Sequence, residues 1–147
     1  MFFERPEAGS RALLVHVDQR DSELATSDEL KELVVSASLD PVGCVTSNRR
    51  FPHPATFLGQ GKVDEIAKSI IEMQAELVVI DAELSPTQER NLELALSIRV
   101  LDRTGLILEI FALRARTHEG KLQVELAQLA HASTRLVRGW THLDRQR

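Results

Sequence analysis

Short apolar runs alternate with amphipathic segments along the first hundred residues of the chain. Four of these runs are bounded by polar residues, a pattern typical of buried parallel strands, and they cover residues 13–17, 42–46, 77–80 and 99–101. Between them, apolar residues recur at helical spacing over residues 28–37, 63–73 and 86–96. This alternation predicts an α/β fold, with a small parallel four-stranded sheet, right-handed crossovers and flanking helices.

The third of these helices has the clearest start signal in the sequence. Ser85 can cap the free backbone amides, and Pro86 suits the first helical position. Gln88 can complete a capping box by bonding back to Ser85. We therefore predict that this helix begins at Pro86.

After residue 102 the pattern changes, because no further strand is predicted. Residues 106–115 have helical spacing, and a much longer helical segment runs from about residue 117 to residue 146. Some thirty helical residues make a rod of about 45 Å, longer than a globule of roughly 115 residues can cover. We therefore expect an α/β domain at residues 1–104 and a helical arm at residues 105–147, part of which projects.

The long helix carries an apolar seam. Its members follow one another at alternating spacings of three and four, interrupted only by Ser133, and we call them the leucine seam: Leu122, Leu126, Leu129, Leu136, Trp140 and Leu143. Most positions between them are polar or charged. The pattern predicts that this helix packs against a helical partner, either a later segment of the same protein or another molecule. Self-association through the seam is therefore one expected function.

Charge is unevenly distributed along the chain. The formal net charge of −4 divides into −8 over residues 1–110 and +4 over residues 111–147. A basic end can bind RNA on an otherwise acidic chain, because attraction to phosphate is screened within about 10 Å at roughly 0.1 M salt. The single cysteine, Cys44, lies in an apolar strand where we expect it to be buried, and no run is long enough for a membrane span. These features indicate a cytoplasmic protein.

The candidate RNA-binding residues are the basic side chains of the arm, with one histidine that could stack on a base. They are Arg114, Arg116, Lys121, Arg135, Arg138, His142, Arg145 and Arg147. Arginine suits phosphate contacts because its planar guanidinium is permanently charged. The alternative is that these residues form only a solvated helix face, and Trp140 is better placed in the seam than on a base.

A glycine-containing loop precedes the second predicted helix. Gly59, Gly61 and Lys62 could hold a phosphate of ATP or GTP with backbone amides and an ammonium group. The Walker A pattern is not met, because Thr56 and Val63 stand where it needs glycine and a hydroxyl residue. A turn that uses glycine for its backbone freedom is the preferred interpretation.

No catalytic or metal site is predicted. The histidines are scattered without metal-ligand spacing, and no nucleophile, base and orienting group can be assembled. Asp81 and Asp102 follow the third and fourth strands, where they could line a cleft or, as we prefer, end strands and cap the following segments. We therefore expect no cofactor in this chain.

Five long motifs are distributed over the chain: LDRTGLIL at residues 101–108, RARTHEGKLQVELAQL at 114–129, RLVRGWTHL at 135–143, FLGQGK at 57–62 and LSPTQERNL at 84–92. Together they resemble the HflX family of ribosome-associated GTPases. The resemblance extends over nearly the whole chain. It implies an amino-terminal α/β domain followed by two long antiparallel helices, of which this chain contains the first.

The same resemblance implies a function for the parent protein. Members of the family bind the large ribosomal subunit and its rRNA, and they split or rescue stalled ribosomes. Their GTP and magnesium are held by a separate G domain, whose motifs are absent here, as are the glycine-rich loop and the returning helix. We therefore expect ribosome binding but no GTP hydrolysis from this segment, with the second hairpin helix and the G domain as its partners within the parent protein.

Overall fold

The computed structural model describes residues 7–17, 27–47 and 53–145, with the side chains of the last helix described as far as Thr134. Four parallel strands form one sheet in the order β2-β1-β3-β4. The strands are β1 (Arg11–Val17), β2 (Asp40–Ser47), β3 (Leu77–Ile80) and β4 (Arg99–Leu101). The predicted α/β fold with a small parallel sheet is confirmed.

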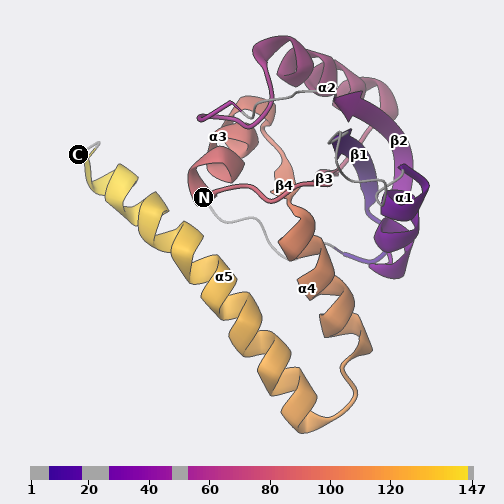
Figure 1. The fold of residues 1–147 in the computed structure, drawn as a ribbon, viewed down its shortest axis with the longest axis vertical. Coiled ribbons are helices and arrows are strands. Elements are labelled where there is room, and N and C mark those ends of the chain that lie inside the picture. Colours follow the sequence, from indigo (N-terminus) through magenta and orange to yellow (C-terminus); the bar gives the residue numbers. More distant parts are fainter. Residues whose placement is uncertain (1–6, 18–26, 48–52, 146–147) are drawn as a thin grey trace.

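The helices within the α/β part connect the strands, and two further helices follow β4 (Figure 1). They are α1 (Ser27–Ser36), α2 (Gln60–Met73), α3 (Pro86–Leu96), α4 (Arg103–Arg114) and α5 (His118–Arg145). The αβ alternation of the sequence thus appears in the predicted order.

Both faces of the sheet are covered, so its strands are buried on two sides. Leu13 and Val15 of β1 belong to a core formed with α2 and α3. Their neighbours Ala12 and Leu14 belong to a second core, formed with α1 and α4. Successive strand side chains point to opposite faces, and burying each large apolar one contributes about 1.5 to 3 kcal/mol. This explains why the strands are continuous apolar runs rather than alternating ones.

The predicted capping box at the start of α3 is confirmed. The Ser85 hydroxyl accepts a hydrogen bond from the Gln88 backbone N–H at 3.1 Å, and the Gln88 side-chain oxygen accepts from the Ser85 N–H at 2.9 Å. The Gln88 amide also donates to the His53 carbonyl at 3.0 Å. The box therefore both starts the helix and holds a loop that precedes α2.

Two helices begin about one turn earlier than the apolar spacing predicts. Helix α2 starts at Gln60, so that Gly61 and Lys62 lie in its first turn instead of in a loop before it. Helix α4 starts at Arg103, because the Asp102 carboxylate accepts a hydrogen bond from Gly105 N–H and acts as the N-cap. First helical turns are often polar, and apolar periodicity does not detect them.

The expectation that Cys44 is buried is wrong, because the residue is exposed on β2. Strand β2 lies at the edge of the sheet, where Val45 and Ser47 are buried while Cys44 and Thr46 between them are exposed. Partial burial nevertheless raises the pKa of the Cys44 thiol, an effect opposed by a hydrogen bond to the backbone of His16. A raised pKa keeps the thiol protonated and poorly nucleophilic at neutral pH.

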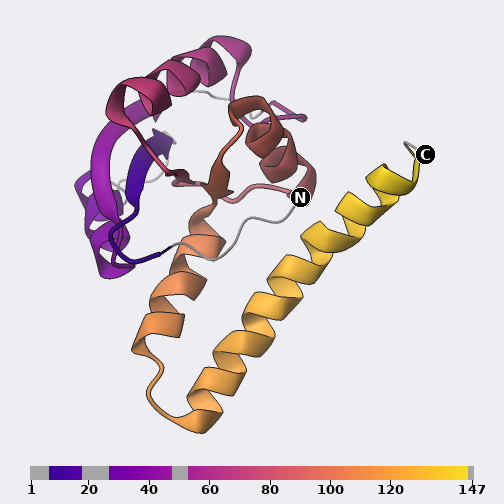
Figure 2. The same ribbon diagram turned by 180° about the vertical axis from the view of Figure 1, so that it is seen from behind.

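Helices α4 and α5 form a hairpin that extends from the α/β body (Figures 1 and 2). Helix α4 leads away from the sheet, and α5 returns antiparallel to it, contacts α3 and then diverges from the body towards its C-terminal end. The long helix is thus present as predicted, and part of it projects. Among the described residues α5 packs against α4 and α3, and the described part of the leucine seam lies on a different face of α5 from the one that packs on α4.

Candidate nucleic-acid interface on the helical arm

The turn between α4 and α5 lies at the end of the hairpin, well away from the sheet (Figure 1). Thr117 caps α5, because its hydroxyl accepts a hydrogen bond from the Gly120 N–H at 2.9 Å. A Cβ atom on residue 120 would lie 2.8 Å from that hydroxyl, so glycine permits the close approach. Ala115 closes α4 with an N–H bond to the Phe111 carbonyl. The turn is therefore tightly defined by local bonds.

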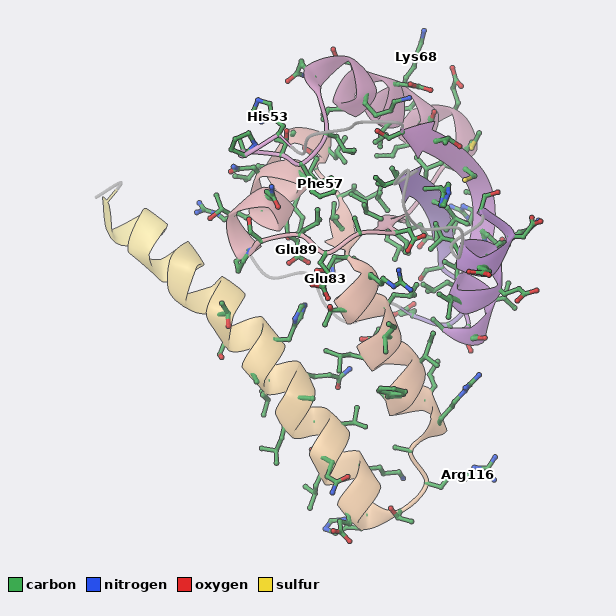
Figure 3. The ribbon with its side chains drawn as sticks, in the orientation of Figure 1. His53, Phe57, Lys68, Glu83, Glu89 and Arg116 are labelled. Atoms are coloured by element: carbon green, nitrogen blue, oxygen red, sulfur yellow. The ribbon has the colours of Figure 1, made fainter. Side chains whose placement is uncertain are left out.

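Three of the predicted RNA-binding residues gather at this turn. We call Arg114, Arg116 and Lys121 the basic tip, and all three side chains are exposed. Figure 3 shows Arg116 beside the turn, well away from the sheet. Among the described residues, no acidic side chain forms an ion pair with any of the three. Glu119 lies in the same first turn of α5, so the basic tip presents a net positive rather than a purely positive charge at the end of the hairpin. A net positive charge in this position suits contact with phosphate.

The remaining predicted RNA-binding residues lie where the structure gives no side-chain description. Arg135, Arg138, His142 and Arg145 are on α5 beyond its last described side chain, and Arg147 lies outside the described residues. The seam residues Leu136, Trp140 and Leu143 fall in the same region. Their proposed contacts stay predictions.

The described part of the leucine seam faces solvent. Leu122, Leu126 and Leu129 are 45%, 67% and 64% exposed. The opposite face of α5 packs on the body through Val124, Gln128 and His131, which are only partly exposed. The described part of the seam is therefore open to another helix, while on the other face Gln128 Nε2 donates to Glu109 Oε1 of α4 at 3.5 Å.

The glycine loop has a geometry that competes with anion binding. Gly59 is the N-cap of α2 and offers no side-chain cap. The Lys62 ammonium donates to the Thr46 carbonyl at 2.9 Å and pairs with Glu65 at 2.8 Å. The lysine thus ties α2 to the end of β2. Phosphate binding by Gly59, Gly61 and Lys62 stays a prediction, and any phosphate would have to replace these two contacts.

A polar cluster lies where the strands end. Asp102 is 2% exposed, and its carboxylate accepts hydrogen bonds from Gly105 N–H at 2.8 Å and Leu84 N–H at 3.2 Å. Its capping function, preferred over a place in a cleft, is confirmed. The Asp81 carboxylate lies between two side chains, with Oδ2 at 3.4 Å from His16 Nδ1 and Oδ1 at 3.6 Å from Arg103 Nη1. The Arg103 guanidinium therefore forms an ion pair with this carboxylate.

A contact that the sequence did not suggest connects this cluster to the arm. His131 Nε2 of α5 lies 3.8 Å from Asp102 Oδ1. The two residues are 29 positions apart, and no local spacing relates them. The sequence gives one signal for this contact, which is that His131 stands between two alanines, Ala130 and Ala132, on the helix that carries the leucine seam.

Two classes of site find no support among the described residues. Within residues 7–17, 27–47 and 53–145, no three histidine, cysteine, aspartate or glutamate side chains come together as a metal site requires. None of the described helices has the length and apolar character that a membrane span needs.

Comparison with known proteins identifies two consecutive family regions. Residues 25–112 match the model of the GTP-binding GTPase N-terminal family, and residues 114–147 match that of the GTP-binding GTPase middle region. Among solved structures, a GTP-binding protein from the archaeon Sulfolobus solfataricus in complex with GDP superposes with a TM-score of 0.69 at 26% identity, over 90% of this chain and 40% of that one.

Curated relatives agree with the family models. The GTPase HflX of Escherichia coli K12 is 54% identical over 146 residues, which cover 99% of this chain and 34% of that protein. The GTPase HflX of Lacrimispora saccharolytica is 52% identical over 91% of this chain and 32% of its own length. This chain thus spans about a third of the length of these relatives. It belongs to the HflX family of GTPases and corresponds to their amino-terminal domain and the start of their middle region.

Proposed function

We propose that this chain is a ribosome-binding unit of an HflX GTPase, which contacts rRNA of the large subunit through its helical arm. The observation that carries the proposal is the basic tip, where three exposed cations stand at the end of a hairpin and form no ion pair with another described residue. The rest of the protein is acidic, so nonspecific attraction of the α/β body to RNA is weak. Binding is therefore directed to the arm.

Rigidity supports the same proposal. The turn that holds the basic tip is fixed by the Thr117 cap and by the backbone bond that closes α4. Cations held in fixed positions lose less conformational entropy on binding than cations on a flexible tail. A defined hairpin also suits recognition of RNA by shape, which is how much of double-stranded RNA is recognised.

GTP hydrolysis is assigned by this proposal to the part of the parent protein beyond this chain. The nucleotide and its magnesium would be held there, and the present segment would supply attachment to the ribosome. A cytoplasmic, ribosome-associated location follows from the proposal. The segment alone is accordingly expected to bind ribosomes without hydrolysing GTP.

Co-sedimentation with purified ribosomal subunits tests the proposal. The 147-residue chain is expected to pellet with large subunits through a sucrose cushion and to stay in the supernatant with small subunits alone. Selectivity is the informative result, because a merely basic tail would bind both subunits through their phosphates. Equal pelleting with both subunits, or with neither, would contradict a specific large-subunit function.

The exposed leucine seam favours a second candidate function, the binding of another helix. Leu122, Leu126 and Leu129 lie on one exposed stripe of α5, and packing such leucines against a partner contributes about 1.5 to 3 kcal/mol each. The family resemblance makes the returning helix of the parent protein the native occupant. A chain without that helix has an open seam.

The second candidate predicts self-association of the 147-residue chain. Analytical ultracentrifugation is expected to reveal a dimer that forms with rising concentration and that Leu129→Asp abolishes, because a buried carboxylate in the seam is costly. Ala127→Asp places the same charge on an exposed position of α5 outside the seam and should leave the dimer intact. A monomer at high concentration would rule out self-association through these leucines.

A further inference from the structure

An aromatic side chain is exposed in the last turn of α4, next to the basic tip. Phe111 is 53% exposed, whereas Phe57, the other phenylalanine among the described residues, is 7% exposed. Leu106 and Ile110 of the same helix are buried in the core, so they anchor α4 without the ring of Phe111. The ring is therefore free for a contact outside the described part of the chain.

Phe111 lies on the side of α4 that faces away from α5. Glu109, two positions earlier, accepts a hydrogen bond from Gln128 of α5 at 3.5 Å. Successive helical residues are turned by about 100°, so residues two positions apart point to roughly opposite sides. The described part of the leucine seam, in turn, lies on the face of α5 opposite the one that packs on α4. A helix bound at the seam therefore leaves the Phe111 ring uncovered.

Arg114 brings a cation to the same face of α4 as Phe111. The two residues are three positions apart, and side chains at this spacing are neighbours, with Cβ atoms about 5 to 6 Å apart. Arg116 follows in the turn, beside which Figure 3 shows it. The Ala115 N–H donates to the Phe111 carbonyl at 2.9 Å and closes the helix at this point. Local backbone structure thus keeps the ring and the two arginines close together.

This combination suits an unpaired nucleotide of RNA better than it suits a protein. The flat face of an aromatic ring stacks on any base, and a guanidinium binds the phosphate beside it. One such side chain offers at most about 250 Å² of surface, whereas a stable protein interface buries about 800 Å² on each partner. The basic tip has three cations against the single carboxylate of Glu119, which favours an occupant that carries phosphate. The surface therefore has the size and the charge for one nucleotide.

We propose that Phe111 is a stacking site for an unpaired base of RNA, with Arg114 and Arg116 holding the adjoining phosphates. The inference rests on the proposed function, because it needs RNA at the basic tip, and it adds the kind of RNA that binds there. A base in a bulge or a loop can turn towards the ring, whereas the bases inside a duplex are stacked on one another. Single-stranded segments are therefore preferred to duplex at this point of the arm.

Two strands that carry the same phosphates test the stacking. One is a single-stranded oligouridine of about ten nucleotides, and the other is an abasic RNA strand of the same length. Fluorescence anisotropy is expected to give a Kd at least about fivefold lower for oligouridine, because base–aromatic stacking adds to the phosphate contacts. Phe111→Leu should remove this difference, and Phe111→Trp should keep it. Equal Kd values for the two strands, or a difference that survives Phe111→Leu, would overturn the proposal.

Purified large ribosomal subunits separate this inference from the proposed function. Phe111→Leu should raise the Kd for large subunits at least about fivefold, whereas Leu113→Ala, which removes an exposed apolar side chain from another side of α4, should leave it unchanged. A loss of subunit binding in Phe111→Leu while both strands bind equally would mean that the ring contacts a ribosomal protein, which overturns the proposal. Tight subunit binding that Phe111→Leu leaves unchanged would overturn the stacking alone. An unchanged protein that binds neither strand nor large subunits would overturn the proposed function as well.

Discussion

Replacing Asp102 by alanine is expected to lower the free energy of unfolding by about 3 kcal/mol. The substitution removes the N-cap of α4 and leaves the N–H groups of Leu84 and Gly105 without their acceptor at a buried site. Losing the cap, which is the bond from Gly105 N–H, costs about 1 kcal/mol, and the orphaned buried N–H of Leu84 costs a further ~1 to 3 kcal/mol. Urea denaturation followed by far-ultraviolet circular dichroism measures the change.

A matched control separates this effect from the loss of a carboxylate in general. Asp28 is exposed in the first turn of α1, where it interacts favourably with the helix dipole, and Asp28→Ala should cost well under about 1 kcal/mol. A loss below about 1 kcal/mol for Asp102→Ala would mean that the carboxylate does not join α4 to the loop after β3.

Charge reversal at the basic tip is expected to have the largest effect on ribosome affinity. Arg114→Glu together with Arg116→Glu should raise the Kd for large subunits by at least about 100-fold, because like charges brought together at an interface cost several kcal/mol. Both side chains are exposed, so the fold should be unaffected. Fluorescence anisotropy with labelled protein and purified large subunits measures the Kd.

The control for this pair has the same change in net charge. Lys31→Glu with Lys68→Glu places two acidic residues on exposed positions of α1 and α2, and Figure 3 shows Lys68 on the body, remote from the basic tip. This variant should bind nearly as the unchanged protein does. Equal losses in both variants would show that overall charge, and not the position of the tip, determines binding.

Much of the fold could be predicted because its signals are local. The strands are apolar runs of the length that a doubly covered sheet needs, and β3, β4 and α3 begin and end at the predicted residues. The capping box of α3 depends on residues only three positions apart. Such signals need no knowledge of how distant segments meet.

The errors and omissions concern relations between distant segments. Cys44 is exposed because β2 is an edge strand, and strand order is not encoded in any single run. The first turns of α2 and α4 were missed because they are polar. The sequence does not single out Arg114, Arg116 and Lys121 among the basic residues of the arm. Only the turn after α4 brings these three together as the basic tip. The contact of His131 with Asp102 likewise depends on the angle at which α5 returns.

The salt dependence of large-subunit binding tests the proposed function most directly. Each phosphate contact contributes roughly 0.7 to 0.9 to the slope of log affinity against log salt concentration, so replacing Arg114 and Arg116 with glutamine should lower the slope by about 1.5. The predicted result is that the unchanged protein has a steep slope and that the glutamine variant has one lower by this amount. Identical slopes for the two proteins, or binding that is indifferent to salt, would contradict an rRNA interface at the basic tip.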